Sequence, residues 1–263
     1  MTISKDKLKL STNISKNVII NFTKNDVLKT KRQIRATEYY GMQETFDQLY
    51  KDSKSGKKYT KIMEIISSKD NILLAYRNLK NNKGGQTPGV DGKTIDFLED
   101  LSSDEIVAMI QSKLMNYNPK PVKRVYIPKA NGKMRPLGIP CIEDRLVQQC
   151  VKQVLEPICE AKFHPQSYGF RPQRQAHHAI SEFMRNANRA GNHYVVDIDI
   201  KGFFDNVNHS KLLKQLWSLG IQDKNLLCVI KKCLLAPIEE KGSNGEIVRI
   251  YPTKGTPQGG ILS

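Results

Sequence analysis

The chain has 263 residues, 39% of them hydrophobic and 26% charged, which is typical of a globular protein with one large domain or two small ones. Its 42 Lys and Arg outnumber its 26 Asp and Glu, and the net charge of +16 predicts a polyanionic partner: RNA, DNA or an anionic membrane surface. No apolar run approaches the ~20 residues of a membrane helix, and residues 1–11 lack the apolar stretch of a secretory signal, so neither a membrane-spanning nor a secreted protein is expected.

Residues 1–57 are rich in lysine and weakly patterned. Segments 14–22 and 39–50 carry enough apolar residues to fold against something, whereas residues 51–58 are expected to form a linker. We interpret residues 1–57 as a basic extension that grips RNA; a disordered, solubilising tail is the alternative. The RNA contacts expected in this extension and just after it are Lys29, Lys31, Arg32, Arg35, Lys57 and Lys58.

The middle of the chain is expected to be mostly helical. A Gly-rich loop is predicted at residues 81–92, and a β-hairpin at 122–139 that turns at Asn131-Gly132. Ser103 is the expected N-cap of the helix that it begins. Apolar spacing predicts helices over residues 62–79 (broken near Ser67), 103–115, 142–158 and 175–190.

The C-terminal third alternates between strands and helices. Residues 194–200 are predicted to form a strand, and a second hairpin is predicted over 236–251 with its turn at 243–245. Helices are predicted over 209–219 and 223–235. This mixture of hairpins and helices predicts an α+β fold rather than a doubly wound parallel sheet.

The most informative segment is YVVDIDIKGFFDNVNH at residues 194–209. Side chains alternate along a strand, so Asp197 and Asp199 share one face, while Val196 and Ile198 are expected to pack into the core from the other. Two adjacent carboxylates repel each other, and a bound Mg²⁺ would remove that conflict because it prefers hard oxygen ligands. The alternative is that the carboxylates are solvated or bonded to a nearby Arg.

Two further segments are candidates for substrate contacts. The Gly-rich stretch GTPQGGILS at residues 255–263 would let a backbone approach a substrate closely. The basic hairpin PVKRVYIPKANGKMRPLGIPCIEDR at residues 121–145 is the other, although it could equally be a solvated ribbon. The adjacent His177 and His178 point ~100° apart on a helix, and the five Cys form no CxxC pair, so no His or Cys metal site is expected.

In their order along the chain, these segments resemble the reverse transcriptases of group II introns. The pattern Asp199-x4-Phe204-Asp205 resembles motif A of right-hand polymerases, GTPQGGILS resembles motif B, and IPK…RPLGIP…DR resembles the hairpin of the polymerase fingers. SYGFRPQR and PGVDGKT resemble two further blocks of the same family.

The resemblance covers roughly residues 60–263 and implies a right-hand polymerase architecture. The fingers would span residues 58–190 and part of a palm would span 191–263, after the basic extension at 1–57.

Roles at the reaction centre follow from the resemblance. Asp199 would bind the catalytic metals with its carboxylate, and Ile200 would add its backbone carbonyl oxygen. Phe204 would exclude a ribose 2′-OH by occupying its space; Phe203 is the competing assignment, but its spacing from Asp199 fits less well. The residues expected to cap the following turn and helix are Asp205 and His209.

The resemblance also assigns substrate contacts outside motif A. In motif B, Gln258 would contact the nascent base pair, next to Gly259. Cations of the fingers hairpin would stabilise the charge of the leaving pyrophosphate. These nucleotide-binding cations are Lys129 and Arg135, followed by Lys123. The remaining expected RNA contacts are Arg124, Arg171 and Arg174.

The activity implied by the family is RNA-templated addition of dNTPs to a primer 3′-OH, with Mg²⁺ as cofactor and a two-metal mechanism. The implied partners are group II intron RNA, an RNA template with a DNA primer, and dNTPs, in a bacterial cytoplasm or an organelle. The alternative is a maturase module that binds intron RNA and assists splicing without catalysis. A retron, diversity-generating or CRISPR-linked reverse transcriptase is a third, weaker possibility.

The sequence departs from the family at motif C. This Tyr-x-Asp-Asp turn supplies the other two metal-binding carboxylates, and no such pattern occurs in the 263 residues. Two-metal chemistry needs ions ~3.5–4 Å apart and clamped from both sides, so the chain alone is expected to be inactive and to bind Mg²⁺ weakly or not at all. Motif A would then be an exposed sheet edge, which predicts self-association, for example as a homodimer.

Overall fold

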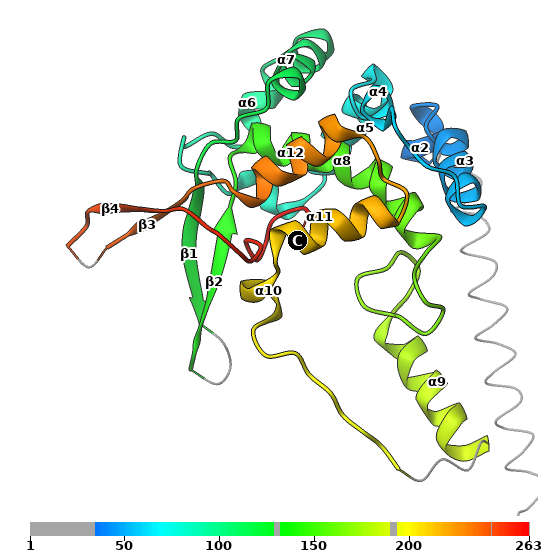
Figure 1. The fold of residues 1–263 in the computed structure, drawn as a ribbon. Helices are drawn as coiled ribbons and strands as arrows, with labels where there is room; N and C mark the ends of the chain where they lie inside the picture. Colours follow the sequence, from blue (N-terminus) through cyan, green and yellow to red (C-terminus); the bar gives the residue numbers. More distant parts are fainter. Residues whose placement is uncertain (1–34, 129–131, 190–193, 243, 263) are drawn as a thin grey trace, which may run out of the picture. The chain divides into compact units, whose positions relative to one another are not determined.

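The computed structural model describes residues 35–128, 132–189, 194–242 and 244–262 (Figure 1). The chain divides into two units, Met1–Tyr39 and Tyr40–Ser263. The described part of the first unit contains the short helix α2 (Ala36–Tyr39) and Arg35, which is exposed. The predictions that lie outside the described residues concern segment 14–22, Lys29, Lys31, Arg32 and Lys129.

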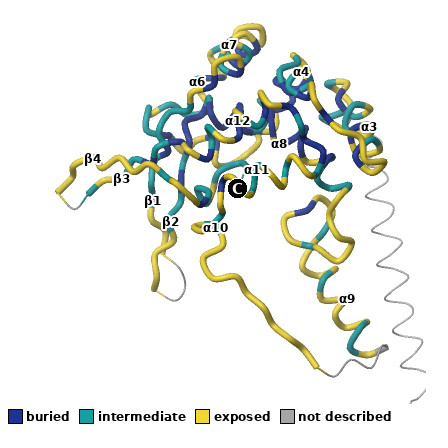
Figure 2. Tube along the Cα trace, viewed as in Figure 1, coloured by how far each residue is buried: buried dark blue, intermediate teal, exposed yellow. Residues whose placement is uncertain are grey.

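A long helix, α8 (Ile142–Glu160), is at the centre of the second unit. Its apolar side chains repeat at helical spacing and are almost all buried, as the dark blue tube in Figure 2 shows. The helices that pack against α8 are α3 (Gln43–Lys54), α4 (Ile62–Ile66), α5 (Lys69–Lys80) and α7 (Ser103–Met115).

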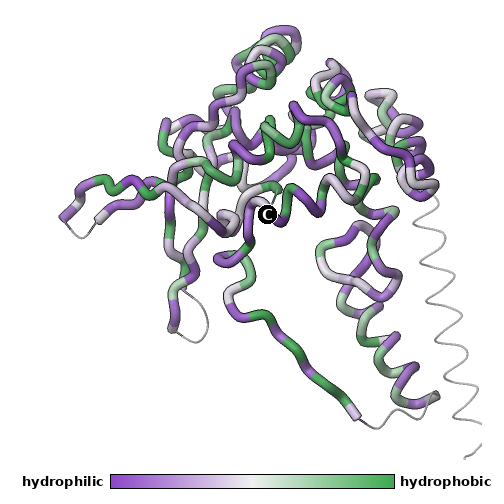
Figure 3. Tube along the Cα trace, viewed as in Figure 1, coloured by the Kyte–Doolittle hydropathy of each residue, from purple (hydrophilic) through white to green (hydrophobic). Residues whose placement is uncertain are grey.

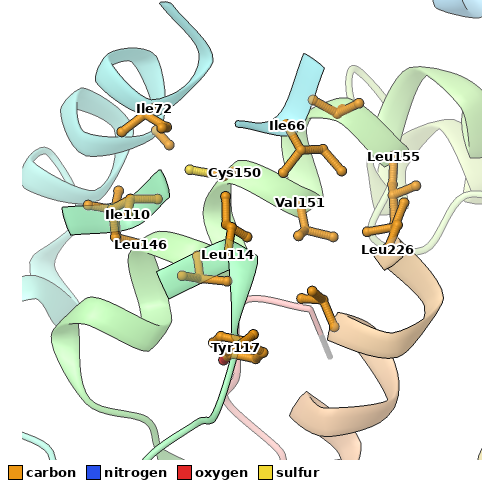
Figure 4. Close-up of a cluster of buried hydrophobic side chains, with 14 of the residues drawn as sticks. Ile66, Ile72, Ile110, Leu114, Tyr117, Leu146, Cys150, Val151, Leu155 and Leu226 are labelled. Carbon is orange, nitrogen blue, oxygen red and sulfur yellow. The ribbon is translucent and has the colours of Figure 1, made fainter. Parts of the chain in front are cut away.

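Two later helices complete this core. α12 (Lys224–Leu234) packs against α4, and α11 (His209–Ser218) packs against α12. Figure 4 shows Leu226 of α12 next to Leu155 of α8, so the C-terminal third shares one core with the middle of the chain. None of the helices in the described ranges is long and apolar enough to cross a membrane.

Four strands form one sheet in the order β2-β1-β3-β4. They are β1 (Val122–Pro128), β2 (Met134–Ile139), β3 (Ile238–Lys241) and β4 (Ile247–Ile250). Both predicted hairpins are confirmed, because β1 pairs antiparallel with β2 and β3 pairs antiparallel with β4. β3 also pairs with β1, in parallel, so strands from the expected fingers and the expected palm share a sheet. The α+β fold is confirmed.

Polar side chains cap four of the described helices, α5, α7, α11 and α12, near the residues where the sequence predicts helix starts. Ser102, rather than Ser103, caps α7 and forms a capping box with Glu105. Ser68 caps α5, which explains the break predicted between the two short helices. The Gly-rich loop between α5 and α7 contains the 3-10 turn η1 (Lys83–Gln86) and is followed by α6 (Asp96–Glu99).

The linker predicted over residues 51–58 is wrong for its first residues, because α3 continues to Lys54. Ser53 is buried, and its hydroxyl donates to the carbonyl oxygen of Ile158 in α8 (2.8 Å). The boundary between the two units follows Tyr39, so the last part of the expected basic extension belongs to the core around α8.

The strand predicted over residues 194–200 does not form. The segment is extended, but it pairs with no described strand, and Val196 and Ile198 are 82% and 83% exposed rather than buried. Figure 3 shows it as a largely hydrophobic stretch between α9 (Ala176–Arg189) and α10 (Phe203–Asn206). A strand needs a neighbour for its backbone hydrogen bonds as well as alternating side chains, and the four described strands pair with one another.

Candidate functional site

A pocket of about 100 Å³ is lined by segments that are distant in sequence. Strand β1 contributes Arg124, α10 contributes Phe204 and Asp205, and the loop after β4 contributes residues 254–258. We call this site the central pocket; its other lining residues are Leu234, Ala236, Ile238 and Pro252. The central pocket thus brings together Phe204 and Gln258, which the sequence assigned to nucleotide binding from two different motifs.

Backbone hydrogen bonds hold the loop after β4 between α10 and β2. The amide of Thr256 donates to the carbonyl oxygen of Phe204 (2.8 Å), and the amide of Gly138 donates to that of Gln258 (2.8 Å). Gly255 has φ +83°, and a Cβ there would lie 2.9 Å from the Phe204 carbonyl oxygen. Only glycine fits this position, so the glycine of motif B allows the loop to lie directly against α10.

Arg124 brings a cation with an unpartnered hydrogen-bond donor to the central pocket. Its Nε atom is buried without a hydrogen-bond partner, and no ion pair in the described part of the chain involves its guanidinium. The hydroxyl of Thr256 is also buried and unpartnered. Burying such groups without a partner is costly, so the pocket suits a ligand that accepts hydrogen bonds and carries negative charge. The sequence assigned Arg124 to RNA and missed Thr256.

Of the two adjacent phenylalanines, only Phe204 lines the central pocket, whereas Phe203 is 54% exposed. Their rings meet edge to face, with centroids 5.7 Å apart. The geometry therefore favours Phe204 as the residue that faces a bound sugar. Asp205 also lines the pocket rather than capping the next helix, because Asn208 is the N-cap of α11.

Asp197 and Asp199 lie on the exposed segment that leads to α10. No hydrogen bond or ion pair within the described ranges occupies either carboxylate. Carboxylate oxygens and the carbonyl oxygen of Ile200 are ligands that Mg²⁺ prefers, so the donor types fit the ion. The described residues contain no group of three or more His, Cys, Asp or Glu that could hold a metal.

Of the cations predicted for the triphosphate, Lys123 and Arg135 do not line the central pocket, and Lys129 lies outside the described residues. Arg124 lies opposite Gly138 in the β1–β2 register, so the two residues share one face of the hairpin. This face meets the loop after β4, because a Cβ at Gly138 would touch Pro257. By strand alternation and register, Lys123 and Arg135 lie on the opposite face. The sequence recognised the basic hairpin but could not tell which of its cations faces the substrate motifs.

Two larger pockets lie elsewhere in the second unit. One, of about 510 Å³, lies between α4, α7 and α12, and no predicted site residue lines it. The other, of about 480 Å³, runs along β1 and β3 and is lined by Lys123 and Arg124 together with Glu239 and Glu240. Lys241 lines this pocket as well, and Asp205 lines the central pocket, so charge alone does not distinguish the two.

Arg171 has a structural role instead of the exposed RNA contact that the sequence predicted. Its Nη2 and Nε atoms donate to the Glu160 carboxylate (2.6 and 2.9 Å). Its Nη1 atom donates to the carbonyl oxygens of His164 and Ser167, both at 2.7 Å. These bonds occupy the guanidinium and fold the loop between α8 and α9. Arg174 is half-buried and donates to the backbone of the same loop.

The Gly-rich loop between α5 and α7 is held by charged side chains from other elements. Arg145 of α8 donates to the carbonyl oxygens of Gly84 (2.7 Å) and Thr87 (2.5 Å). Asp91 forms an ion pair with Lys120 (3.0 Å). The arginine of the IEDR sequence therefore holds the residues that directly precede the PGVDGKT block, a relationship that the sequence did not reveal.

The two lysines predicted to bind RNA at the end of the basic extension differ in their surroundings. Lys57 forms an ion pair with Asp52 (2.6 Å), whereas Lys58 is exposed and makes no hydrogen bond or ion pair within the described residues. Of the two ammonium groups, that of Lys58 is therefore the one free to contact a phosphate.

Comparison with known proteins gives the family. The pattern described as "Reverse transcriptase (RNA-dependent DNA polymerase)" matches residues 127–263, which is more than half of the chain. Group II intron-encoded protein LtrA of Lactococcus lactis subsp. cremoris is 42% identical over 207 residues, which cover 78% of this chain and 33% of LtrA. Protein YkfC of Escherichia coli (strain K12) is 36% identical over 208 residues, which cover 77% of this chain and 53% of YkfC.

An uncharacterized 91 kDa protein in the cob intron of Schizosaccharomyces pombe is 35% identical over 218 residues, or 80% of this chain and 26% of that protein. A chain of a partial Cas6-RT-Cas1--Cas2 complex has a TM-score of 0.47 at 22% identity and covers 79% of this chain and 33% of its own length. The chain thus spans about half of YkfC and a third of LtrA. It belongs to the reverse transcriptase (RNA-dependent DNA polymerase) family and is of the group II intron type.

Proposed function

We propose that the protein with this sequence is an RNA-directed DNA polymerase that adds dNTPs to a primer on an RNA template. The observation that carries the proposal is the convergence of Arg124, Phe204 and Gln258 on the central pocket. At about 100 Å³ this pocket is smaller than the ~300 Å³ of a typical small-molecule site, so it would take the sugar and an adjoining phosphate rather than a whole nucleotide.

Three residues that line the pocket would each have a distinct task. The ring of Phe204 would occupy the space of a ribose 2′-OH, and Gln258, with the adjacent Gly259, would lie against the nascent base pair. The charge of Arg124 would offset negative charge on a phosphate. The other cations proposed to contact the triphosphate from the β1–β2 hairpin are Lys123, Lys129 and Arg135.

Asp199 and the carbonyl oxygen of Ile200 are the proposed Mg²⁺ ligands, with Asp197 beside them. A bound Mg²⁺ would neutralise charge on the triphosphate and favour deprotonation of the primer hydroxyl. Two-metal chemistry needs carboxylates on both sides of the ions, and Asp199 supplies one side. We therefore propose that the 263-residue chain alone does not extend a primer.

Binding of intron RNA in support of splicing is a second candidate function. The net charge of +16 and the exposed ammonium of Lys58 favour a polyanionic partner. The Arabidopsis thaliana relative named "Nuclear intron maturase 2, mitochondrial" is 32% identical over 105 residues.

The domain division that we propose consists of a basic extension (1–57), fingers (58–190) and a partial palm (191–263). The exposed apolar side chains of segment 194–200 also favour homodimer formation, which light scattering would detect as a doubled mass.

Primer extension by the complete gene product, with an RNA template, a DNA primer and dNTPs, tests the polymerase assignment. Asp199→Asn keeps the shape of the side chain but removes the charge that would bind Mg²⁺, so extension is expected to fall about a hundredfold or more. Asp100→Asn is the matched control, because Asp100 is exposed at the end of α6. Equal extension by the two variants would contradict the assignment.

A further inference from the structure

His209 is a buried polar residue that the proposed chemistry does not use. It is the first residue of α11 and is 7% exposed. Its Nε2 atom lies 2.7 Å from the carbonyl oxygen of Gly255, so the ring donates this hydrogen bond, and its Nδ1 atom is buried without a partner. The helix does not need His209 as a cap, because the Asn208 side chain accepts from the amide of Lys211 (2.9 Å).

The bond from His209 is one of four among the described residues that join the loop after β4 to the segment that follows Asp199; one of the others runs from the Lys254 ammonium to the Asn206 side chain (2.8 Å). The amide of Gly255 donates to the carbonyl oxygen of Val207 (2.8 Å), and the amide of Thr256 donates to that of Phe204 (2.8 Å). The bonds of Gly255 and Thr256 are between backbone groups, whereas those of His209 and Lys254 come from side chains, and Lys254 is exposed while His209 is buried. A substitution at His209 can therefore weaken the junction without changing the backbone.

The junction lies next to the residues that line the central pocket. Phe204 provides a carbonyl oxygen to the junction and also lines the pocket, and Gln258 follows Thr256 by two residues. Because Gly255 lies against the carbonyl oxygens of Phe204 and Asp205, a shift of the loop changes the spacing across the pocket. The position of Gln258 relative to the Phe204 ring therefore depends on this junction.

We propose that His209 is a positioning residue that fixes motif B against motif A and so sets the distance across the central pocket. It does not touch substrate in this account; it acts through the backbone of Gly255. The inference rests on the proposed polymerase function. Loss of the bond would weaken nucleotide binding and lower the discrimination against ribonucleotides. It would slow the chemical step at Asp199 less.

Three variants of the complete gene product separate this role from simple packing. His209→Ala removes the hydrogen bond, and His209→Gln keeps an N–H near the position of Nε2. His177→Ala is the matched control, because His177 is exposed on α9. The measurements are KM and kcat for a dNTP and the ratio of ribonucleotide to deoxyribonucleotide incorporation.

His209→Ala is expected to raise KM about tenfold, to raise the relative incorporation of ribonucleotides, and to change kcat less. His209→Gln should recover most of the wild-type KM and selectivity, and His177→Ala should match the wild type. If His209→Ala lowers stability but leaves KM and the incorporation ratio unchanged, His209 is only a packing residue and the inference is overturned.

Amide hydrogen exchange on the 263-residue chain distinguishes this inference from the proposed function. If the wild-type gene product extends no primer, the proposed function fails, but the junction can still be measured. The amides of Gly255 and Thr256 should exchange faster in His209→Ala than in the wild type and in His209→Gln. Equal exchange rates in all three proteins would refute the positioning role whatever the protein catalyses.

Discussion

The amide of Gly138 in β2 donates a hydrogen bond to the carbonyl oxygen of Gln258 (2.8 Å), and this bond joins the β1–β2 hairpin to motif B. A Cβ at position 138 would lie 2.8 Å from Cβ of Pro257 and 2.8 Å from Cγ1 of Val122. The hairpin and the motif B loop can approach this closely only because residue 138 is a glycine.

Gly138→Ala is expected to lower the free energy of unfolding by about 1–3 kcal/mol, because the added methyl group must displace Pro257 or Val122. Urea denaturation of the 263-residue chain measures this change. Gly169→Ala is the matched control, since a Cβ at Gly169 meets no heavy atom within 4 Å. Equal destabilisation by the two variants would contradict the tight contact described at Gly138.

Glu143 at the start of α8 accepts hydrogen bonds from Lys93 (3.0 Å) and Lys113 (3.1 Å). Burial acts to raise the pKa of Glu143, but the bonds and charges of these lysines outweigh it and hold the pKa below the ordinary value of 4.5. A carboxyl group with a lowered folded-state pKa stabilises the fold above its unfolded pKa, and this stabilisation is lost as the pH falls through the folded value.

Glu143→Gln is therefore expected to lower the free energy of unfolding by about 2 kcal/mol at pH 7 and by less near pH 3. The neighbouring Asp144 has a pKa raised by burial and contributes with the opposite sign, so the variant must be compared with the wild type at each pH. Glu64→Gln, at an exposed residue of α4, is the control. If the difference in the free energy of unfolding between wild type and Glu143→Gln does not shrink on acidification, the lowered pKa of Glu143 is contradicted.

Arg171 is expected to be needed for the fold of the loop between α8 and α9, because its guanidinium bonds to Glu160 and to two carbonyl oxygens of the loop. Arg171→Gln should make residues 161–175 more susceptible to limited proteolysis. Arg174→Gln should have a smaller effect, since Arg174 donates to a single carbonyl oxygen of this loop, that of Pro165. If the two variants are cut at the same rate, the ion pair does not hold the loop.

Lys58 is expected to contact RNA phosphates, since its ammonium is exposed and unpaired among the described residues. The affinity for an intron RNA should fall steeply with salt, and Lys58→Ala should reduce the slope of log K against log salt by about 1. Lys57→Ala should change the slope less, because Lys57 is paired with Asp52. Binding that is independent of salt would exclude phosphate contacts as the main source of affinity.

Features set by neighbouring residues could be predicted from the sequence. The helices α7, α11 and α12 begin and end within about two residues of their predicted bounds, because caps and apolar spacing are local signals. The two hairpins were also found, since their strands are separated by short turn sequences. The strand predicted over 194–200 does not form, because a strand depends on a partner that local alternation cannot identify.

The candidate site was predictable in its residue types but not in its geometry. The motifs identified Phe204 and Gln258, which the structure brings to one pocket. They did not indicate that Arg124 would face this pocket while Arg135 lies on the other side of the strands, because that depends on how the hairpin meets the motif B loop. His209 was interpreted as a helix cap, and its bond to Gly255, 46 residues away, has no local signal.

Nucleotide selectivity tests the central claim most directly, namely that Phe204 faces the sugar of an incoming nucleotide in the central pocket. The measurement is the ratio of kcat/KM for a ribonucleotide to that for the matching deoxyribonucleotide in the complete gene product and its Phe204→Val variant. Opening space beside the 2′ position should raise this ratio about tenfold or more, while Phe203→Val should leave it near the wild-type value. A ratio that does not change in Phe204→Val, or that rises only in Phe203→Val, would contradict the account.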